Sequence, residues 1–221
     1  MVNISRGGGR RAGGLMDKRR AIMSGALGVF ARDGYARASI DAISSAAAVS
    51  TRTIYNHFAD KEELFRTVIR ESSAQVAEAQ FEIIERHLEV DGPAGLEEAL
   101  VAFGLEWATP TPEYADHYAL VRQINAEIEH IPKETVRTWQ RTGPHRVMRD
   151  LAYRLGRLAE RGLLDVDDPD RAALHLALLV STTSPAYLAT TLSPAEVEMM
   201  VRAGVRTFLH GHAPDQGRPM R

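Results

Sequence analysis

The chain has 221 residues, of which 44% are hydrophobic, 25% are charged and only 6% are aromatic. These values are those of a soluble globular protein with a substantial core, which argues against a disordered or fibrous chain. No window approaches the roughly 18 consecutive apolar residues of a membrane span, and the N-terminal arginines are not followed by the apolar region of a secretory signal. The lack of cysteine excludes disulfides and thiolate metal sites. We therefore expect a soluble, cytoplasmic protein with no membrane partner.

The net charge of −2 hides an uneven distribution of charged residues. Residues 1–70 contain 12 lysines and arginines against 6 aspartates and glutamates, whereas residues 71–221 contain 15 against 23. A basic first part joined to an acidic remainder indicates a module that binds a polyanion, attached to a body with a different task. Chance clustering together with a basic tail would give the same numbers, so the charge distribution indicates a polyanion-binding module only if a sequence motif supports it.

Apolar residues recur at helical spacing through most of the chain, and no stretch shows the sustained alternation of a strand. The sequence therefore predicts an all-α fold that is interrupted at prolines and glycines. Asp60 followed by Glu63 has the spacing of a capping box and opens a long helix that ends at about residue 88. Later helices are expected at about 94–108, 113–129, 133–142, 144–161, 169–189 and 193–209. The Arg/Gly arm at residues 1–14 is expected to be disordered and the tail at residues 211–221 flexible.

Two short helices joined by a tight turn are expected between residues 39 and 58. Ser39 is placed to cap the first of them and Ser50 the second, with the turn at residues 48–50. Phe30, on the preceding helix, can bury the face that the two share. This is the arrangement of a helix-turn-helix, which presents its second helix to the major groove of DNA.

The second helix of this motif carries a dense run of hydrogen-bonding side chains, while Ile54 and Phe58 are expected to point inward. The run consists of Thr51, Arg52, Thr53, Tyr55, Asn56 and His57. Ser39, with the first amides of its helix, and Lys61, at the start of the next helix, are placed to meet phosphate oxygens. On the N-terminal arm, Arg10 and Arg11 are expected to enter the minor groove.

From about residue 20 to residue 75 the sequence resembles the TetR family of bacterial transcriptional regulators. The matching residues are Phe30-Ala31-x-x-Gly34-Tyr35, Ile40-x-x-Ile43, Val49-Ser50 and, above all, Thr53-Ile54-Tyr55-x-His57-Phe58-x-x-Lys61-Glu62-x-Leu64-Phe65. One departure is Ala48, where the family usually has glycine. Alanine costs free energy in this turn if its φ angle is positive.

The resemblance implies a homodimer that binds an inverted-repeat operator in double-stranded DNA, usually as a repressor that a small-molecule effector releases. Residues 15–65 would form the DNA-binding domain, with three helices, and residues 66–210 a helical domain for effector binding and dimerisation. Bases would be approached by Thr51, Arg52 and Thr53, backbone or base edges by Tyr55 and His57, and a phosphate by Lys61. The alternative for Tyr55 and His57 is packing against the next helix.

Residues 172–180 are apolar on nearly every side of their expected helix, so this helix must be covered on two sides. The core of its own subunit and a partner subunit would cover it, although a central helix of a monomer would show the same pattern. In the TetR family, the last two long helices of each subunit form a four-helix bundle with those of the partner. The dimer interface is therefore expected to include Ala173, Leu176, Ala177, Val180, Met200 and Val201. Pro185 is expected to kink or weaken the end of this helix.

Aromatic residues are few outside the expected DNA-binding domain, and four of them cluster around one pair of helices. A pocket lined by apolar rings with few polar groups suits a lipophilic or aromatic effector. The candidate lining is Phe103, Trp107, Tyr114, Tyr118 and Met148. Plain core packing of the same side chains is the alternative.

Two other classes of function compete with a regulator. A helical carboxylate-metal enzyme needs two Glu-x-x-His pairs and two further glutamates, and the sequence offers only Glu127-x-x-His130. Glu113 and His117 have the spacing of a metal-binding pair, but also that of an ordinary surface pair. We therefore expect no catalytic residue, no metal and no cofactor. A helical adaptor that keeps the fold without specific DNA binding is the other alternative, and the polar run at 51–57 argues against it.

Overall fold

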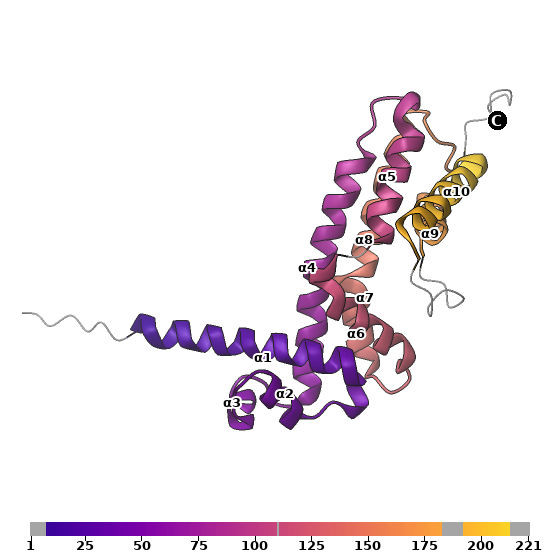
Figure 1. Cartoon of the computed structure of the whole chain (residues 1–221). Coiled ribbons are helices and arrows are strands. Elements are labelled where there is room, and N and C mark those ends of the chain that lie inside the picture. Colours follow the sequence, from indigo (N-terminus) through magenta and orange to yellow (C-terminus); the bar gives the residue numbers. More distant parts are fainter. Residues whose placement is uncertain (1–7, 110, 183–191, 213–221) are drawn as a thin grey trace, which may run out of the picture. The chain divides into compact units, whose positions relative to one another are not determined.

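The computed structural model describes the main chain of residues 8–109, 111–182 and 192–212, and the side chains in these ranges from residue 16 onward (Figure 1). Every regular element in these ranges is helical, which confirms the predicted all-α fold. The α-helices are α1 (Gly8–Arg37), α2 (Ile40–Ala46), α3 (Thr51–Tyr55), α4 (Lys61–Leu88), α5 (Leu96–Ala108), α6 (Ala115–Ala126), α7 (Lys133–Thr142), α8 (Pro144–Glu160), α9 (Pro169–Leu179) and α10 (Pro194–His212). Single 3-10 turns, η1 (Pro93–Gly95) and η2 (Pro112–Tyr114), precede α5 and α6.

The ends of two helices differ from the expectation. α1 begins at Gly8 and so includes half of the arm that was expected to be disordered. Residues can be added to an existing helix without a new nucleus, which offsets the low helix propensity of the four glycines in residues 8–14. α9 ends at Leu179 instead of about residue 189, because the serines and threonines that follow favour helices weakly and Pro185 disfavours helical residues before it. Pro185 itself and the side chains of Arg10 and Arg11 lie outside the described residues.

The chain divides into two compact units. Unit 1 consists of residues 1–74 and 112–142, and unit 2 of residues 75–111 and 143–221. The sequence predicted one helical domain over residues 66–210, followed by a flexible tail. In the structure, the first part of α4 and all of α6 and α7 belong with the N-terminal helices instead.

The core of unit 1 joins the helix-turn-helix to α6 and α7. Phe30 of α1 and Phe65 of α4 meet edge to face, with ring centroids 4.8 Å apart, and α2 and α3 each contribute a fully buried isoleucine. The same core includes Leu120 and Ile124 of α6, Ile131 of the following connection, and Trp139 of α7. α6 packs along α1 more extensively than any other two elements pack together. Helical periodicity predicted an apolar face on α6, but periodicity does not indicate which helix such a face meets.

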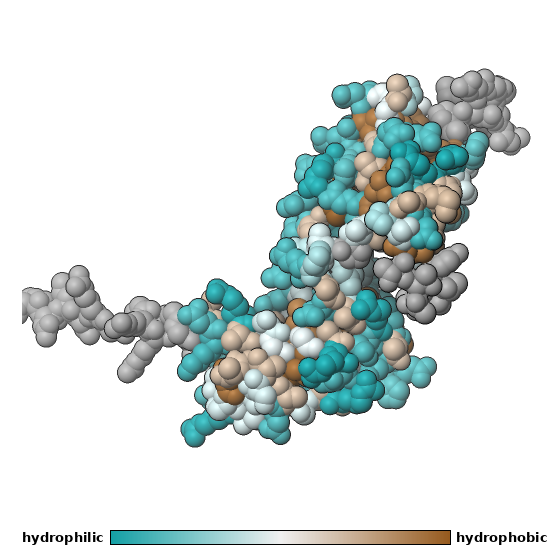
Figure 2. All heavy atoms as spheres, in the orientation of Figure 1, coloured by the Kyte–Doolittle hydropathy of each residue, from teal (hydrophilic) through white to brown (hydrophobic). Residues whose placement is uncertain are grey.

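The core of unit 2 is formed by the second part of α4 together with α5, α8, α9 and α10. Its largest fully buried side chains include Ile84, Leu100, Phe103 and Phe208. Gly104 of α5 lies against the side chains of Val180 and Val201, so the helices approach closely at that point. Hydrophilic residues cover most of the unit 2 surface that Figure 2 draws, and hydrophobic ones emerge in patches.

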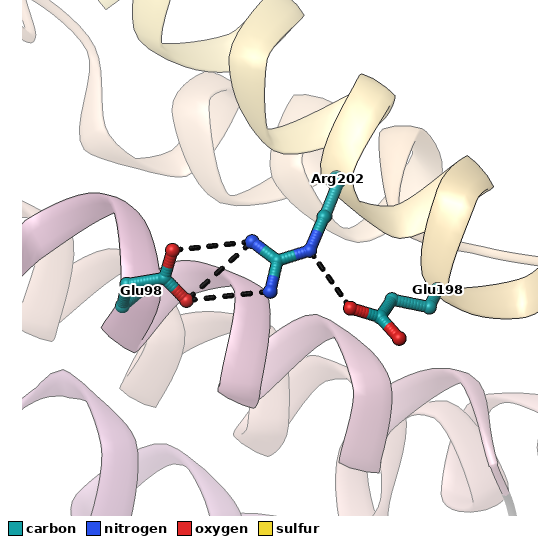
Figure 3. A network of polar contacts seen from close by, with 3 residues as sticks. All are labelled: Glu98, Glu198 and Arg202. Carbon is teal, nitrogen blue, oxygen red and sulfur yellow. Dashed lines mark hydrogen bonds and ion pairs between the residues drawn. The ribbon is translucent and has the colours of Figure 1, made fainter. Parts of the chain in front are cut away.

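An ion-pair network on the surface of unit 2 joins α5 to α10 (Figure 3). The guanidinium of Arg202 donates from Nη1 to Glu98, at 3.1 Å, and from Nε to Glu198, at 2.9 Å. Both carboxylates hold the pKa of Arg202 above its usual range. Because the two carboxylates are largely exposed and the arginine is partly exposed, the network contributes little to stability.

The turn between α2 and α3 contains the departure noted above. Ala48 has a φ angle of +52°, which is the left-handed region that disfavours residues with a Cβ. We expect Ala48→Gly to raise the free energy of unfolding by about 1 kcal/mol, since the relief of strain exceeds the entropy that glycine adds to the unfolded chain. Chemical denaturation measures the change. Ala46→Gly, at the last helical position of α2, is the control and should lower stability; a loss with both variants would contradict the prediction.

A buried histidine makes the stability of unit 1 depend on pH. His117 of α6 is 7% exposed, its Nδ1 lies 3.1 Å from Oγ of Ser72 on α4, and burial lowers its pKa from 6.5 to about 4. Between pH 6.5 and 4 the unfolded chain binds a proton that the folded chain does not, so stability is complete above 6.5 and falls as pH decreases. From pH 7.5 to pH 5 we expect a loss of about 2 kcal/mol from this group.

His117→Gln removes the titrating group while it keeps a polar partner for Ser72. Denaturation curves at the two pH values should therefore show a smaller loss for this variant than for the unaltered chain. His130→Gln, at an exposed position, should leave the loss unchanged. Equal losses in all three proteins would contradict the role assigned to His117.

Candidate nucleic-acid interface

Two serine caps start the helices of the helix-turn-helix. Oγ of Ser39 accepts the N–H of Ala42 at 3.1 Å, and Oγ of Ser50 accepts the N–H of Thr53 at 3.2 Å. Each serine satisfies an amide that the first turn of a helix leaves unpaired. The caps thereby fix where α2 and α3 begin, as their sequence positions predicted.

The residues of α3 and its C-terminal turn separate into a buried side and an exposed side. Ile54 and Phe58 are 0% and 4% exposed and belong to the unit 1 core, as expected. On the other side Arg52, Tyr55 and Asn56 are exposed, and Tyr55 retains 56% of its accessible surface. A large aromatic side chain in this state is not packed against the next helix, so the structure does not support that alternative for Tyr55.

The remaining candidates on α3 are partly engaged within the chain. Thr51 and Thr53 are half-buried, and Oγ1 of Thr53 lies 2.9 Å from Oγ of Ser50. His57 is also half-buried, with its ring centroid 6.3 Å from that of Phe58. Arg52 makes no ion pair with any described residue. The most accessible hydrogen-bonding groups of α3 are therefore those of Arg52, Tyr55 and Asn56.

Lys61, the first residue of α4, lies against the C-terminal end of α1. Its Nζ donates to the carbonyl oxygens of Tyr35, Ala38 and Ala36, at 2.9, 3.1 and 3.4 Å. The ammonium also lies 4.8 Å from the centroid of the Tyr35 ring. An ammonium has three N–H donors, and here each has an acceptor within the chain. Contact of Lys61 with a phosphate stays a prediction. The carbonyl contacts indicate a different role for this residue.

The five candidate pocket residues belong to different units. Phe103 is fully buried in unit 2, with its ring centroid 5.2 Å from that of Trp107, and Met148 packs against the same core. Tyr114 and Tyr118 are half-buried in unit 1. The effector pocket stays a prediction.

Four of the six residues expected at a dimer interface lie inside unit 2 instead. Ala173, Leu176 and Val201 are 0% exposed and Val180 is 1% exposed, so their side chains have no surface left for a partner. Ala177 and Met200 are half-buried. A helix that is apolar all round does not reveal which side meets its own core, and the residues chosen were mostly on that side. The apolar side chains that α9 and α10 expose are Leu174, Leu178, Leu179 and Met199.

The structure gives the Glu127-x-x-His130 motif a different use from metal binding. Glu127 follows the last residue of α6, and its Oε2 accepts the N–H of Ala36 at 3.1 Å. The described side chains contain no group of three or more metal-ligating residues. Sequence reasoning missed this role, because a contact between residues 91 positions apart leaves no local signal.

No helix in the described part of the chain is long and apolar enough to cross a membrane. A capped turn, a short second helix with an exposed polar side, and a separate helical unit together define a DNA-binding regulator of the helix-turn-helix class.

Comparisons with known proteins agree with this class. Residues 22–68 match the model of the bacterial regulatory proteins of the tetR family, and residues 98–214 match the C-terminal domain of AefR-like transcriptional repressors. The HTH-type transcriptional repressor AcnR of Corynebacterium efficiens is 30% identical over 165 residues, which are 74% of this chain and 77% of that protein. The chain belongs to the TetR family and is a transcriptional repressor of the TetR type.

Solved structures show the same fold. The crystal structure of a chain assigned to the TetR-family regulators of Mesorhizobium loti superposes with a TM-score of 0.75 at 27% identity and covers 90% of this chain and 98% of that one. The Flavonoid-responsive Regulator FrrA superposes with a TM-score of 0.63 at 30% identity, covering 89% and 97%.

Proposed function

We propose that this repressor binds an inverted-repeat operator as a homodimer and is released from it by a small lipophilic effector. The observation that carries the proposal is the exposed polar side of α3, formed by Arg52, Tyr55 and Asn56 beside the buried Ile54. In a twofold-symmetric dimer two such helices can enter successive major grooves about 34–36 Å apart, one turn of DNA.

DNA selected from a random library by the purified protein provides the test. The expected product is a duplex with two related half-sites, bound at least about a thousandfold more tightly than a shuffled duplex at physiological salt. Equal, weak binding to every duplex would support the adaptor alternative instead. Light scattering of the complex should give the mass of two chains per duplex or a multiple of two.

The dimer surface that we propose lies on α9 and α10. These two helices pack against each other and expose Leu174, Leu178 and Met199, which are 51%, 64% and 65% exposed. Large apolar side chains exposed together on neighbouring helices are a feature of surfaces that a second protein covers. A second copy of the chain would cover this surface in the four-helix bundle that the TetR family uses.

Leu178→Glu should dissociate the dimer. Burying a carboxylate in an apolar interface is costly, and the same carboxylate at an exposed position of a monomer is not. We expect light scattering at micromolar concentration to change from the mass of two chains to that of one, with the helical content retained. The control is Ile128→Glu, which changes an exposed apolar residue of unit 1 that is 45% exposed. A dimeric mass for Leu178→Glu would contradict the proposed surface.

The effector class that we propose is a planar, lipophilic molecule. Phe103 and Trp107 form a ring pair in the unit 2 core, and a relative at 30% identity is named for its response to flavonoids. Flavonoids that differ in their ring substituents, each titrated at constant protein concentration, would sample this class. A binding member should quench the tryptophan fluorescence, to which Trp107 and Trp139 both contribute, with the quenching lost in Trp107→Phe. It should also lower the affinity for the selected duplex, because release requires tighter binding to the state that does not bind DNA.

A further inference from the structure

The segment of residues 34–38, which consists of the end of α1 after its kink at Gly34 and the adjoining Ala38, is held from two sides by helices that are distant in sequence. Lys61 of α4 donates from Nζ to the carbonyl oxygens of Tyr35, Ala36 and Ala38. Glu127, at the C-terminal end of α6, accepts the N–H of Ala36 at 3.1 Å. Ala36 therefore donates its amide to α6 and offers its carbonyl to α4. Opposite charges suit these roles, because a carboxylate only accepts and an ammonium only donates.

Gly34 makes room for the carboxylate of Glu127. Its φ angle is +76°, and a Cβ built on it would lie 2.8 Å from the carboxyl carbon of Glu127. Any other residue at position 34 would both strain the backbone and displace this carboxylate. The helical path of α1 breaks at this glycine, and the following residues turn toward α2.

The segment leads directly to the elements that face DNA. Ser39, the N-cap of α2, follows Ala38, whose carbonyl lies 3.1 Å from Nζ of Lys61. The packing of α6 along α1 holds the helices by apolar contacts of Leu120 and Ile124, but it supplies no polar contact to this segment. Glu127 and Lys61 supply those contacts and so hold the segment that leads into the Ser39 cap of α2.

We propose that Glu127 and Lys61 are positioning residues for DNA binding, which tie the 34–38 segment to α6 and α4 and thereby orient the helix-turn-helix. The inference deepens the proposed operator binding and rests on it. It differs from the phosphate contact that the family resemblance implies for Lys61, because all three donors of that ammonium have acceptors in the chain. It also assigns Glu127 an indirect role in DNA binding, although the negative charge of its carboxylate would repel the phosphates of DNA.

The test is to titrate the selected duplex and the shuffled duplex with variants at several salt concentrations. For Glu127→Ala and for Lys61→Ala we expect about a tenfold loss of affinity for the selected duplex, the equivalent of one or two net hydrogen bonds. Affinity for the shuffled duplex and the dependence of binding on salt should not change, because no phosphate contact is lost. Glu127→Gln should bind the selected duplex like the unaltered protein, since its amide oxygen still accepts the N–H of Ala36.

Three results would overturn the proposal. Unaltered affinity of Glu127→Ala for the selected duplex would remove Glu127 from DNA binding. A decrease of about 0.9 in the salt slope of Lys61→Ala, with weaker binding to both duplexes, would make Lys61 a phosphate contact. Equal losses on both duplexes that follow the unfolded fraction measured by circular dichroism would leave only a structural role.

Matched controls are available in unit 1. Glu129→Ala and Lys133→Ala remove charges of the same kinds from exposed positions, and both should bind like the unaltered protein. Because Ala36 is itself exposed, its freed amide can bind water, so Glu127→Ala should fold. Failure of the unaltered protein to prefer any selected duplex would contradict the proposed function, and it would be seen before any variant is compared.

Discussion

Gly204→Ala is expected to lower the free energy of unfolding by about 3 kcal/mol, near the upper end for overpacked cores. Gly204 is buried on α10, and a Cβ built there would lie 2.7 Å from the carbonyl carbon of Leu179, the last residue of α9. The obstacle is backbone, which cannot rotate away as the end of a flexible side chain can. α10 would have to move away from α9, and the buried contacts of Val201, Val205 and Phe208 would loosen with it.

Thermal unfolding at a fixed protein concentration measures this loss, which corresponds to a melting temperature lower by about 6–12 °C for a chain of this size. Gly211→Ala is the matched control, since it makes the same change on the same helix where no atom lies within 4 Å of the added Cβ. The control should be neutral or slightly stabilising, because alanine favours helices more than glycine does. Melting temperatures that change equally would show that the contact between α9 and α10 does not limit the size of residue 204.

The fold was predictable where the signals are local. Ser39 and Ser50 were identified as caps because an N-cap acts on amides two or three residues away. The buried Ile54 and Phe58 and the bounds of α7 and α8 followed from helical periodicity and from proline and glycine. The sequence made strain at Ala48 conditional on a positive φ angle in the turn, and the observed φ angle of +52° meets that condition.

The site was less predictable where it depends on contacts between distant residues. Periodicity gives a helix an apolar face but not its partner, so the packing of α6 against α1 was not foreseen. On α9 every side is apolar, and only the packed structure separates Leu176, in the core, from Leu178, on the surface. For Lys61 the sequence predicts a phosphate contact but not its three carbonyl acceptors, because these belong to residues 23 to 26 positions earlier. Such backbone acceptors are the same for every residue type and leave no trace in the sequence.

Tyr55→Ala is expected to weaken binding to the selected operator by about 10- to 100-fold, the range of one good contact to a base or backbone. Tyr55 lies on the exposed side of α3 with 56% of its surface accessible, so stability should change by less than about 0.5 kcal/mol. Fluorescence anisotropy with the selected duplex measures the affinity, and denaturation of the same preparation measures the stability. Tyr55→Phe separates the ring from the hydroxyl: a large loss with Phe would assign the contact to the hydroxyl.

The matched control is Tyr153→Ala, which removes a tyrosine of similar exposure, 63%, from α8 of unit 2. Its operator affinity should be unchanged, and an equal loss in both variants would mean that Tyr55 acts through something other than the DNA-facing side of α3. Arg52→Ala completes the comparison on that side. A loss confined to one base-pair position of the operator would indicate that Arg52 reads a base, whereas a uniform loss with a salt slope smaller by about 0.9 would indicate a phosphate. Arg52 has no ion-pair partner among the described residues, so no such pair has to be broken before its guanidinium makes either contact.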